Sequence, residues 1–326
     1  MRIPARVVGW GRHHPDEVVT NADLEARLDT SDEWIRERTG IASRRVGGVT
    51  SEMASAAALQ AVRRWGGDPA TIDVVTVATS TPDRIMPPVA AAVASAVGAG
   101  AGMFDLNGAC TGFVQALVGA HGLLAAGVQR VLVVGSDAMS RITDPEDRST
   151  AILFGDGAGA LLLETSGDAD SPCSGGLLSA DFGGDPTTRD ILTCAAGGYI
   201  EMQGQAVFKV AIRAATDSAV RALDAAGIEA RDVDLFVPHQ ANQRITDAIA
   251  SRLGLAEHAV MSTIEETANT SAATVPAALS VAADDGRLRD GHHVLLSGFG
   301  AGMTWATAVL RWDSGGRAPS LMADSP

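Results

Sequence analysis

The chain has 326 residues, of which 46% are hydrophobic and 20% are charged, with a formal net charge of -14. This length and apolar content can bury a large core, in one domain or in two of about 150 residues. The negative charge disfavours nucleic acid and anionic membranes as partners, because both select basic surfaces.

Three features of the sequence indicate a cytoplasmic protein. No apolar run approaches the ~20 residues that a membrane-spanning helix needs. The N-terminal segment lacks the apolar region of a signal peptide. The three cysteines cannot form a complete set of disulfides. We therefore expect neither a membrane nor nucleic acid as a partner.

Two segments, 58–80 and 218–240, share one order of elements: an amphipathic helix, a glycine stop, an acidic turn and an apolar strand. A strand followed by a glycine turn recurs at 130–137 and 293–300, at a similar offset. The repetition predicts an internal duplication, with two α/β units that pack together and contain mostly parallel sheet.

The duplication suggests how the chain is divided. We expect one unit over residues 1–170, a second over 171–312 and a mobile tail over 313–326, which is rich in Gly, Pro and Ser. The same offset pairs Asn107 with Asn269, and it places the helix after Cys110 opposite the helix that begins near Asn269.

The stretch DLNGACTGF, at 105–113, places Cys110 at the start of an apolar helix. The free N–H groups and the dipole at a helix N-terminus favour a thiolate, which would lower the thiol pKa from about 8.5 and make Cys110 a nucleophile. A small buried core residue is the alternative. We expect Cys173 and Cys194 to be small core residues of this kind, because they lie in an irregular stretch rich in Gly, Ser and Ala.

Two polar residues of the second half accompany this cysteine. His239 follows the apolar strand DLFV, at the strand end where open α/β sheets place ligands, although a structural histidine is an alternative. Asn269 lies in a polar loop before a helix of small residues, where an N-cap role would also account for it. Because Cys110, His239 and Asn269 all lie at strand ends or helix starts, they can converge on one pocket.

Several stretches occur along the chain in a recognisable order: TSDEWIRERTGI (30–41), DLNGACTGF (105–113), DPEDRSTAILFGDGAGALLL (144–163), VPHQANQRI (237–245), NTSAATVPAAL (269–279) and GFGAGMTW (298–305). Together they resemble the signature motifs of the β-ketoacyl-acyl carrier protein synthase III family of condensing enzymes, over residues 1 to about 312. The resemblance implies an α/β thiolase fold, with two pseudo-equivalent βα units in a layered α-β-α-β-α arrangement. It also implies a homodimer whose sheet continues from one subunit to the other.

The resemblance implies an acyltransferase that joins an acyl-coenzyme A primer to malonyl-acyl carrier protein by decarboxylative Claisen condensation, in fatty acid or polyketide initiation. Cys110 would carry the acyl group as a thioester. His239 and Asn269 would hydrogen-bond the malonyl thioester carbonyl, and the backbone N–H groups of Cys110 and Ala301 would form the oxyanion hole. Loss of carbon dioxide generates the carbanion directly, so neutral donors suffice. Coenzyme A thioester would be a substrate, with no permanent cofactor and no metal.

The resemblance also assigns contacts to coenzyme A. Trp34 and Arg148 match the pair that sandwiches the adenine ring, and Arg38 matches a contact at the same mouth. Asn242 matches an asparagine near the pantetheine arm. For Trp34 and Arg38, an exposed helix face with a packed indole is the alternative interpretation.

Basic residues of the second half match positions that the family presents to the acidic carrier protein. They are Lys209, Arg244 and Arg252, and in an acidic chain they would form a local patch whose effect salt weakens. Ordinary surface charges are the alternative.

The sequence departs from the family pattern at two places. Met86 lies where members commonly have a phenylalanine that crosses the dimer interface and limits the acyl pocket. Because methionine is adaptable, we expect a deeper or more plastic pocket, and an acetyl primer is not assured. The segment 185–205 is also short, which would open the entrance or alter dimer contacts.

Two other functions compete with condensation. A non-condensing acyltransferase of the same family would pass an acyl group to an oxygen or amine acceptor in secondary metabolism, and a noncatalytic priming subunit would form no acyl-cysteine. We favour condensation, because Asn269 has a clear role only when an enolate must be held. The loop LLSGFGAGM also lacks the second cysteine that a thiolase uses as a base.

Overall fold

The computed structural model describes residues 3–166 and 175–317. Within these residues, nine strands form a sheet in the order β11-β12-β13-β8-β1-β7-β6-β4-β5. In chain order they are β1 (Ile3–His13), β4 (Val74–Ala78), β5 (Gly102–Leu106), β6 (Arg130–Ala138), β7 (Asp156–Thr165), β8 (Gly176–Gly184), β11 (Leu235–Pro238), β12 (His293–Gly300) and β13 (Thr304–Arg311).

The expectation of a mostly parallel sheet is wrong. β4 runs parallel to β5 and β6, and β11 runs parallel to β12. The remaining pairs are antiparallel, namely β1 with β7 and β8, β6 with β7, β12 with β13 and β8 with β13. A tight loop over 301–303 connects β12 to β13, and so short a connection permits only an antiparallel pair.

The strand order supports the predicted duplication. The first half has the order β5-β4-β6-β7-β1, and in the second half β11, β12, β13 and β8 take the places of β4, β6, β7 and β1. An isolated parallel bridge from Phe236 to Val260 takes the place of β5. The halves join where Ile3 and Pro4 of β1 pair with β8. The predicted boundary between residues 170 and 171 lies outside the described residues.

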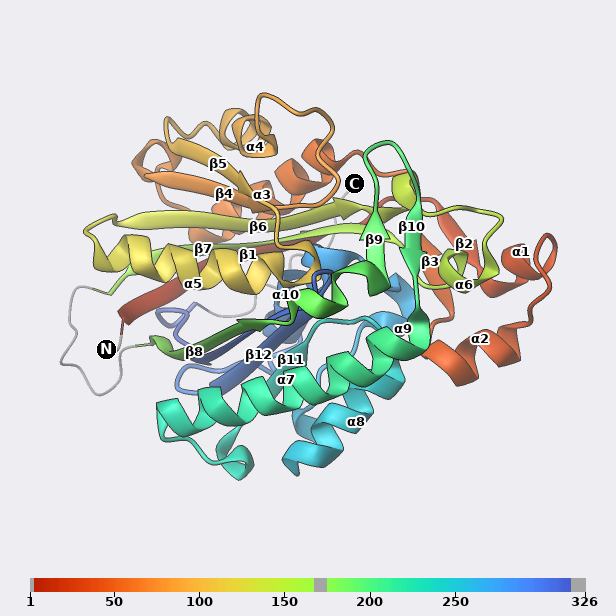
Figure 1. The fold of residues 1–326 in the computed structure, drawn as a ribbon. Coiled ribbons are helices and arrows are strands. Elements are labelled where there is room, and N and C mark those ends of the chain that lie inside the picture. Colours follow the sequence, from red (N-terminus) through yellow and green to blue (C-terminus); the bar gives the residue numbers. More distant parts are fainter. Residues whose placement is uncertain (1–2, 167–174, 318–326) are drawn as a thin grey trace.

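Helices cover both halves and fill the space between them (Figure 1). α3 (Thr50–Trp65) and α4 (Val89–Val97) lie on one outer face, and α7 (Gly204–Ala226) and α8 (Gln243–Leu253) on the other. α5 (Gly112–Ala125) and α10 (Thr274–Asp284) lie between the halves, and α10 is buried on nearly all sides, as a core helix is. This arrangement confirms the predicted layered α-β-α-β-α fold.

Short elements gather at one end of the layers (Figure 1). They are β2 (Val18–Thr20), α1 (Asn21–Glu25), α2 (Asp32–Thr39), β3 (Ser43–Arg45), α6 (Arg148–Ala151), β9 (Leu192–Cys194), β10 (Ile200–Met202) and α9 (Ile264–Thr267). Among the described residues, no helix combines the length and apolar character needed to cross a bilayer.

The first residues of the predicted mobile tail are held in place. Asp313 is buried and pairs with Arg6 at 3.3 Å, and the buried Ser314 donates a hydrogen bond to Asp290 at 2.8 Å. Polar groups that are buried and paired resist fraying, so Asp313 and Ser314 do not fit the predicted mobile tail. Residues 318–326 lie outside the described part of the chain.

Each half presses the start of its central helix against a strand of the other half. A Cβ added to Gly135 of β6 would lie 2.3 Å from the backbone oxygen of Ala272, just before α10. A Cβ added to Gly298 of β12 would lie 3.1 Å from the Cα of Thr111, just before α5. The residues before the two helices therefore meet across the pseudo-twofold axis.

We predict that Gly135→Ala lowers the free energy of unfolding by about 2 kcal/mol or more, because its methyl group would collide with the Ala272 carbonyl. Gly119→Ala is the matched control. Gly119 is an exposed glycine inside α5 with open space around its Cβ position, and alanine there should raise stability by about 0.5–1 kcal/mol. Urea unfolding measures both variants. Equal stability of the two variants would show that the close contact is absent.

Candidate active site

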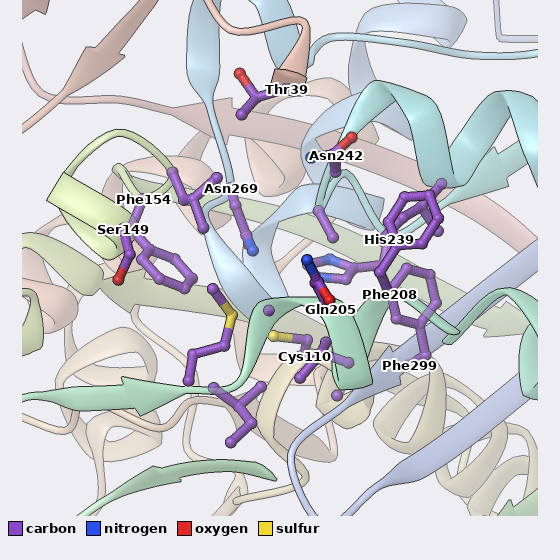
Figure 2. A pocket seen from close by; sticks show the side chains of 18 of the residues that line it. Thr39, Cys110, Ser149, Phe154, Gln205, Phe208, His239, Asn242, Asn269 and Phe299 are labelled. Carbon is purple, nitrogen blue, oxygen red and sulfur yellow. The ribbon is translucent and has the colours of Figure 1, made fainter. Parts of the chain in front are cut away.

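The three residues predicted to act together line one cavity of about 310 Å³. Cys110, His239 and Asn269 reach it from three separate segments of the chain, and Figure 2 shows the nitrogen ends of His239 and Asn269 turned toward the Cys110 side of the cavity. Trp34, Phe208 and other largely apolar side chains line the remaining walls.

Cys110 lies in a 3-10 turn, Ala109–Thr111, that leads directly into α5. Its thiol is 3.5 Å from the hydroxyl oxygen of Ser271. Burial, together with the nearby Asp137 charge, raises the pKa of the Cys110 thiol to about 12. The expectation of a lowered pKa is therefore wrong for the resting protein, because desolvation outweighs the helix N-terminus.

His239 directly follows β11, as predicted, and its backbone N–H donates to Ser297 O at 2.7 Å. Ring nitrogen Nδ1 lies 2.8 Å from the Thr274 hydroxyl, and the ring meets the edge of Phe299. Burial lowers the pKa of His239 to about 3, so the imidazole is neutral at neutral pH. The Thr274 hydroxyl also reaches Ser271 O at 3.0 Å and has one proton to donate. When it turns that proton to Nδ1 instead, the ring proton of His239 sits on Nε2, the nitrogen left for the cavity.

Asn269 follows α9 and precedes a 3-10 turn at Ser271–Ala273. Its side-chain oxygen accepts a hydrogen bond from Ser271 N at 2.9 Å, which closes a local turn. Asn269 is not the N-cap that the alternative interpretation proposed, because Thr270 precedes the 3-10 turn and Ala273 precedes α10. The amide nitrogen is thereby turned into the cavity (Figure 2). One side chain thus closes a local turn and offers a donor to a ligand.

The pair predicted to hold an adenine ring lies at the cavity mouth. The guanidinium carbon of Arg148 is 5.0 Å from the centroid of the Trp34 ring, and that of Arg38 is 5.7 Å away. Arg148 also donates to Asp29 O at 2.7 Å. Trp34 and Arg38 line the cavity. Trp34 also packs against a small core cluster and Arg38 is exposed, so the structure fits the alternative interpretation as well.

Asn242 is the N-cap of α8, and its side chain accepts a hydrogen bond from Arg244 N at 2.9 Å. Its amide nitrogen donates to Arg38 O at 3.0 Å, which ties α8 to α2 beside the cavity.

The three predicted basic residues are all exposed on the two outer helices of the second half. Lys209 on α7 follows Phe208, a residue of the cavity wall, and Arg244 on α8 stacks on Phe208 at 5.6 Å. Arg252 lies at the other end of α8. Arg244 therefore lies against a residue of the cavity wall, Lys209 is an exposed neighbour of that residue on α7, and Arg252 is farther along α8.

A second, smaller pocket of about 90 Å³ adjoins Cys110 and is almost entirely apolar. Its walls include Met139, Ile142, Phe154, Leu192, Cys194 and Ile200, together with Ala301. Apart from Ala301, sequence analysis assigned none of these residues to the site, although the alternating Leu192/Cys194 and Ile200/Met202 pairs of β9 and β10 are the signal of a hairpin.

The structure bears on two further expectations from the sequence, those for the remaining cysteines and for Met86. Cys194 is not a small core residue, because it is exposed and lines the apolar pocket beside Cys110. Cys173 lies outside the described residues. Met86 is 78% exposed in the single chain and lines neither of these two cavities, so its predicted contact requires a second subunit.

Comparison with known proteins identifies the family. The sequence model for 3-oxoacyl-[acyl-carrier-protein] synthase III matches residues 104–186, and the model for its C-terminal part matches residues 223–312. The chain belongs to this family. It is 43% identical to a β-ketoacyl-[acyl-carrier-protein] synthase III of Bradyrhizobium sp. over 96% of this chain and 100% of that protein. It is 44% identical to a Bacillus anthracis relative of the same name over 94% of this chain and 98% of that protein.

Solved structures agree. The 3-oxoacyl-[acyl-carrier-protein] synthase III of Aquifex aeolicus superposes with a TM-score of 0.91 at 38% identity, covering 94% of this chain and 100% of that one. A priming β-ketosynthase from the R1128 polyketide pathway has a TM-score of 0.89 at 38% identity, covering 96% and 98%. The predicted thiolase fold is confirmed. The predicted enzyme class is confirmed as well: a condensing acyltransferase that uses a coenzyme A thioester as substrate.

We predict that the Cys110 thiol stays protonated in the resting enzyme well above neutral pH, because burial raises its pKa to about 12. Thiolate absorbance in the near ultraviolet, taken as the difference between the wild type and Cys110→Ala, should show no step between mildly acidic and mildly alkaline pH. A step centred near neutrality would show instead that the helix N-terminus controls the thiol.

Proposed function

We propose that Cys110 takes an acyl group from acyl-coenzyme A and that the enzyme condenses it with malonyl-acyl carrier protein, in the cytoplasm, to initiate fatty acid or polyketide synthesis. The observation that carries the proposal is the convergence of one thiol and two neutral hydrogen-bond donors on one cavity. A neutral imidazole and an amide suit an enolate that forms by loss of carbon dioxide.

In the first half-reaction, the sulfur of Cys110 attacks the thioester carbonyl, a new C–S bond forms and coenzyme A leaves as its thiolate. The N–H groups of Cys110 and Ala301 would hold the oxyanion. The backbone supports this assignment, because a Cβ on Gly300 would lie 2.9 Å from Cys110 N, and Ala301 follows Gly300.

In the second half-reaction, Nε2–H of His239 and the side-chain amide of Asn269 would donate hydrogen bonds to the thioester oxygen of the malonyl group. As the C–C bond to the carboxylate breaks, negative charge moves onto that oxygen, and the hydrogen bonds from both donors become stronger. The carbanion then attacks the acyl group on Cys110, and the Cys110 thiolate leaves.

The apolar pocket beside Cys110 is the proposed site of the acyl chain. It offers about 90 Å³ and almost no polar surface, which suits a short saturated acyl group. Met86 of a second subunit would close it. A partner is supported by the edge strand β5, where Met103 and Phe104 are 48% and 43% exposed, and by the neighbouring exposed Ile85. Pairing of two β5 edges in a homodimer would cover these side chains.

Coenzyme A would enter along the mouth beside Trp34 and Asn242. Because Arg148 already stacks on Trp34 at 5.0 Å, the adenine ring can be sandwiched only if Arg148 swings away, and its bond to Asp29 O must then break. Arg244 beside Phe208, with the exposed Lys209 on α7 and Arg252 on α8, would orient the acidic carrier protein.

We predict that single substitutions separate the two half-reactions. Cys110→Ala should abolish acylation by acyl-coenzyme A, because the nucleophile is gone. His239→Ala and Asn269→Ala should still become acylated but lose decarboxylation of malonyl-acyl carrier protein by about 100-fold or more. Intact-mass spectrometry measures acylation, and release of labelled carbon dioxide measures decarboxylation.

His258→Ala is the control, since His258 is exposed and lines no part of the cavity. It should behave as the wild type in both assays. Acylation of the wild type without any release of carbon dioxide would contradict condensation and support simple acyl transfer.

A further inference from the structure

A buried carboxylate lies behind the active site and has no part in the steps above. Asp137, near the end of β6, is fully buried. In each hydrogen bond to the Asp137 side chain, a carboxyl oxygen is the acceptor. Oδ1 accepts from Ser80 N at 2.7 Å, Thr79 Oγ1 at 3.0 Å, Thr81 Oγ1 at 3.0 Å and Thr81 N at 3.1 Å, and Oδ2 accepts from Ala272 N at 3.0 Å. This ring of donors indicates a carboxylate in the resting enzyme.

Asp137 is connected to the nucleophile through a single hydroxyl. The residue after Ser271, Ala272, donates its N–H to Asp137 Oδ2 at 3.0 Å, and the Ser271 hydroxyl is close enough to that carboxyl to lower its pKa. The Cys110 thiol donates to the same Ser271 hydroxyl oxygen at 3.5 Å. The N–H of Ser271 donates to the side-chain oxygen of Asn269, which helps to hold Ser271 in place. The backbone of Ser271 is left-handed, with a φ of 53°. Cys110, Ser271 and Asp137 thus form a chain along which a proton can pass.

Acylation needs such a route, because the Cys110 thiol is protonated at rest and must lose its proton. His239 is poorly suited to accept it, since burial lowers its pKa to about 3 and its Nδ1 is engaged with Thr274. Asp137 is better suited, because burial raises the pKa of its carboxyl above the ordinary value. A thiolate and a carboxylate this close would repel each other in a buried site, so transfer of the proton from one to the other keeps the local charge constant.

We propose that Asp137 receives, through the Ser271 hydroxyl, the proton that Cys110 loses on acylation, holds it in the acyl-enzyme and returns it when condensation frees the Cys110 thiolate. This inference rests on the proposed acylation of Cys110. Asp137 touches no substrate and acts through Ser271, so it is a positioning and proton-holding residue.

The protons balance over the cycle. During acylation, the Cys110 proton passes to Ser271 as the Ser271 proton passes to Asp137, and the departing coenzyme A thiolate takes a proton from water. During condensation, the Cys110 thiolate leaves, Ser271 donates to it and Asp137 gives its proton back to Ser271. The net reaction consumes one solvent proton per turnover, as formation of free coenzyme A from a decarboxylative condensation requires.

The test is proton uptake during acylation alone. Wild-type enzyme is mixed with acetyl-coenzyme A at neutral pH, in weak buffer with a pH indicator, and acyl-Cys110 is counted by intact-mass spectrometry. We expect uptake of about one proton per acyl group, because coenzyme A is protonated from solvent while Asp137 keeps the proton of Cys110. Infrared difference spectra should show a new protonated-carboxyl band, absent in Asp137→Asn.

Ser271→Ala keeps the Asp137 carboxylate and removes only the connecting hydroxyl, so it tests the relay even if Asp137→Asn fails to fold. It should acylate about 100-fold more slowly, with no proton uptake for the acylation that remains. Ser136→Ala is the matched control. Ser136 is equally buried and precedes Asp137, but its hydroxyl donates to Thr50 O, so rate and uptake should match the wild type.

The outcomes separate the two proposals. Full acylation of the wild type with no proton uptake and no carboxyl band overturns the relay and leaves the proposed function standing. Uptake that persists in Ser271→Ala at the wild-type rate also overturns it. Failure of the wild type to form acyl-Cys110 overturns the proposed function, and the relay with it.

Discussion

The active site depends on the close contact between the helix start of each half and a strand of the other half. Gly135 and Gly298 have no side chain because the backbones before α10 and α5 occupy that space. The contact brings Cys110 of the first half and Asn269 of the second to one cavity, and His239 reaches the same cavity from the end of β11. Ala109 and Ser271, which hold equivalent places before the two helices, share a left-handed backbone with φ of 48° and 53°.

The same contact between the two halves buries Cys110 and His239, and this burial sets the protonation state of each side chain. The pKa of His239 falls to about 3 and that of Cys110 rises to about 12, both mainly through desolvation. A neutral imidazole keeps one N–H that can donate to an enolate oxygen, so burial is compatible with the second half-reaction. It opposes the first, because a protonated thiol is a poor nucleophile. The chain through Ser271 to Asp137 would resolve that conflict without placing a lasting second charge in the site.

Much of this arrangement could be predicted from the sequence, because it depends on local patterns that repeat. The recurrence of helix, glycine stop and strand in both halves indicated the duplication, and strand ends marked Cys110 and His239. The antiparallel strands were missed, because the hairpin between β12 and β13 turns over a few glycine-rich residues that a pattern of alternating helices and strands does not register. The apolar pocket was missed because its walls come from short elements such as the hairpin of β9 and β10. Asp137 was visible at the end of a strand, but its partners lie 56 and 135 residues away along the chain, a relation that no local pattern contains.

The most direct test of this account is a crystal structure of the enzyme after reaction with a short acyl-coenzyme A. The account predicts an acyl group on the sulfur of Cys110, its carbonyl oxygen within hydrogen-bond distance of the N–H groups of Cys110 and Ala301, and its chain in the apolar pocket beside Met139 and Ile200. An acyl group on Cys194, or a carbonyl oxygen directed away from those two N–H groups, would contradict it.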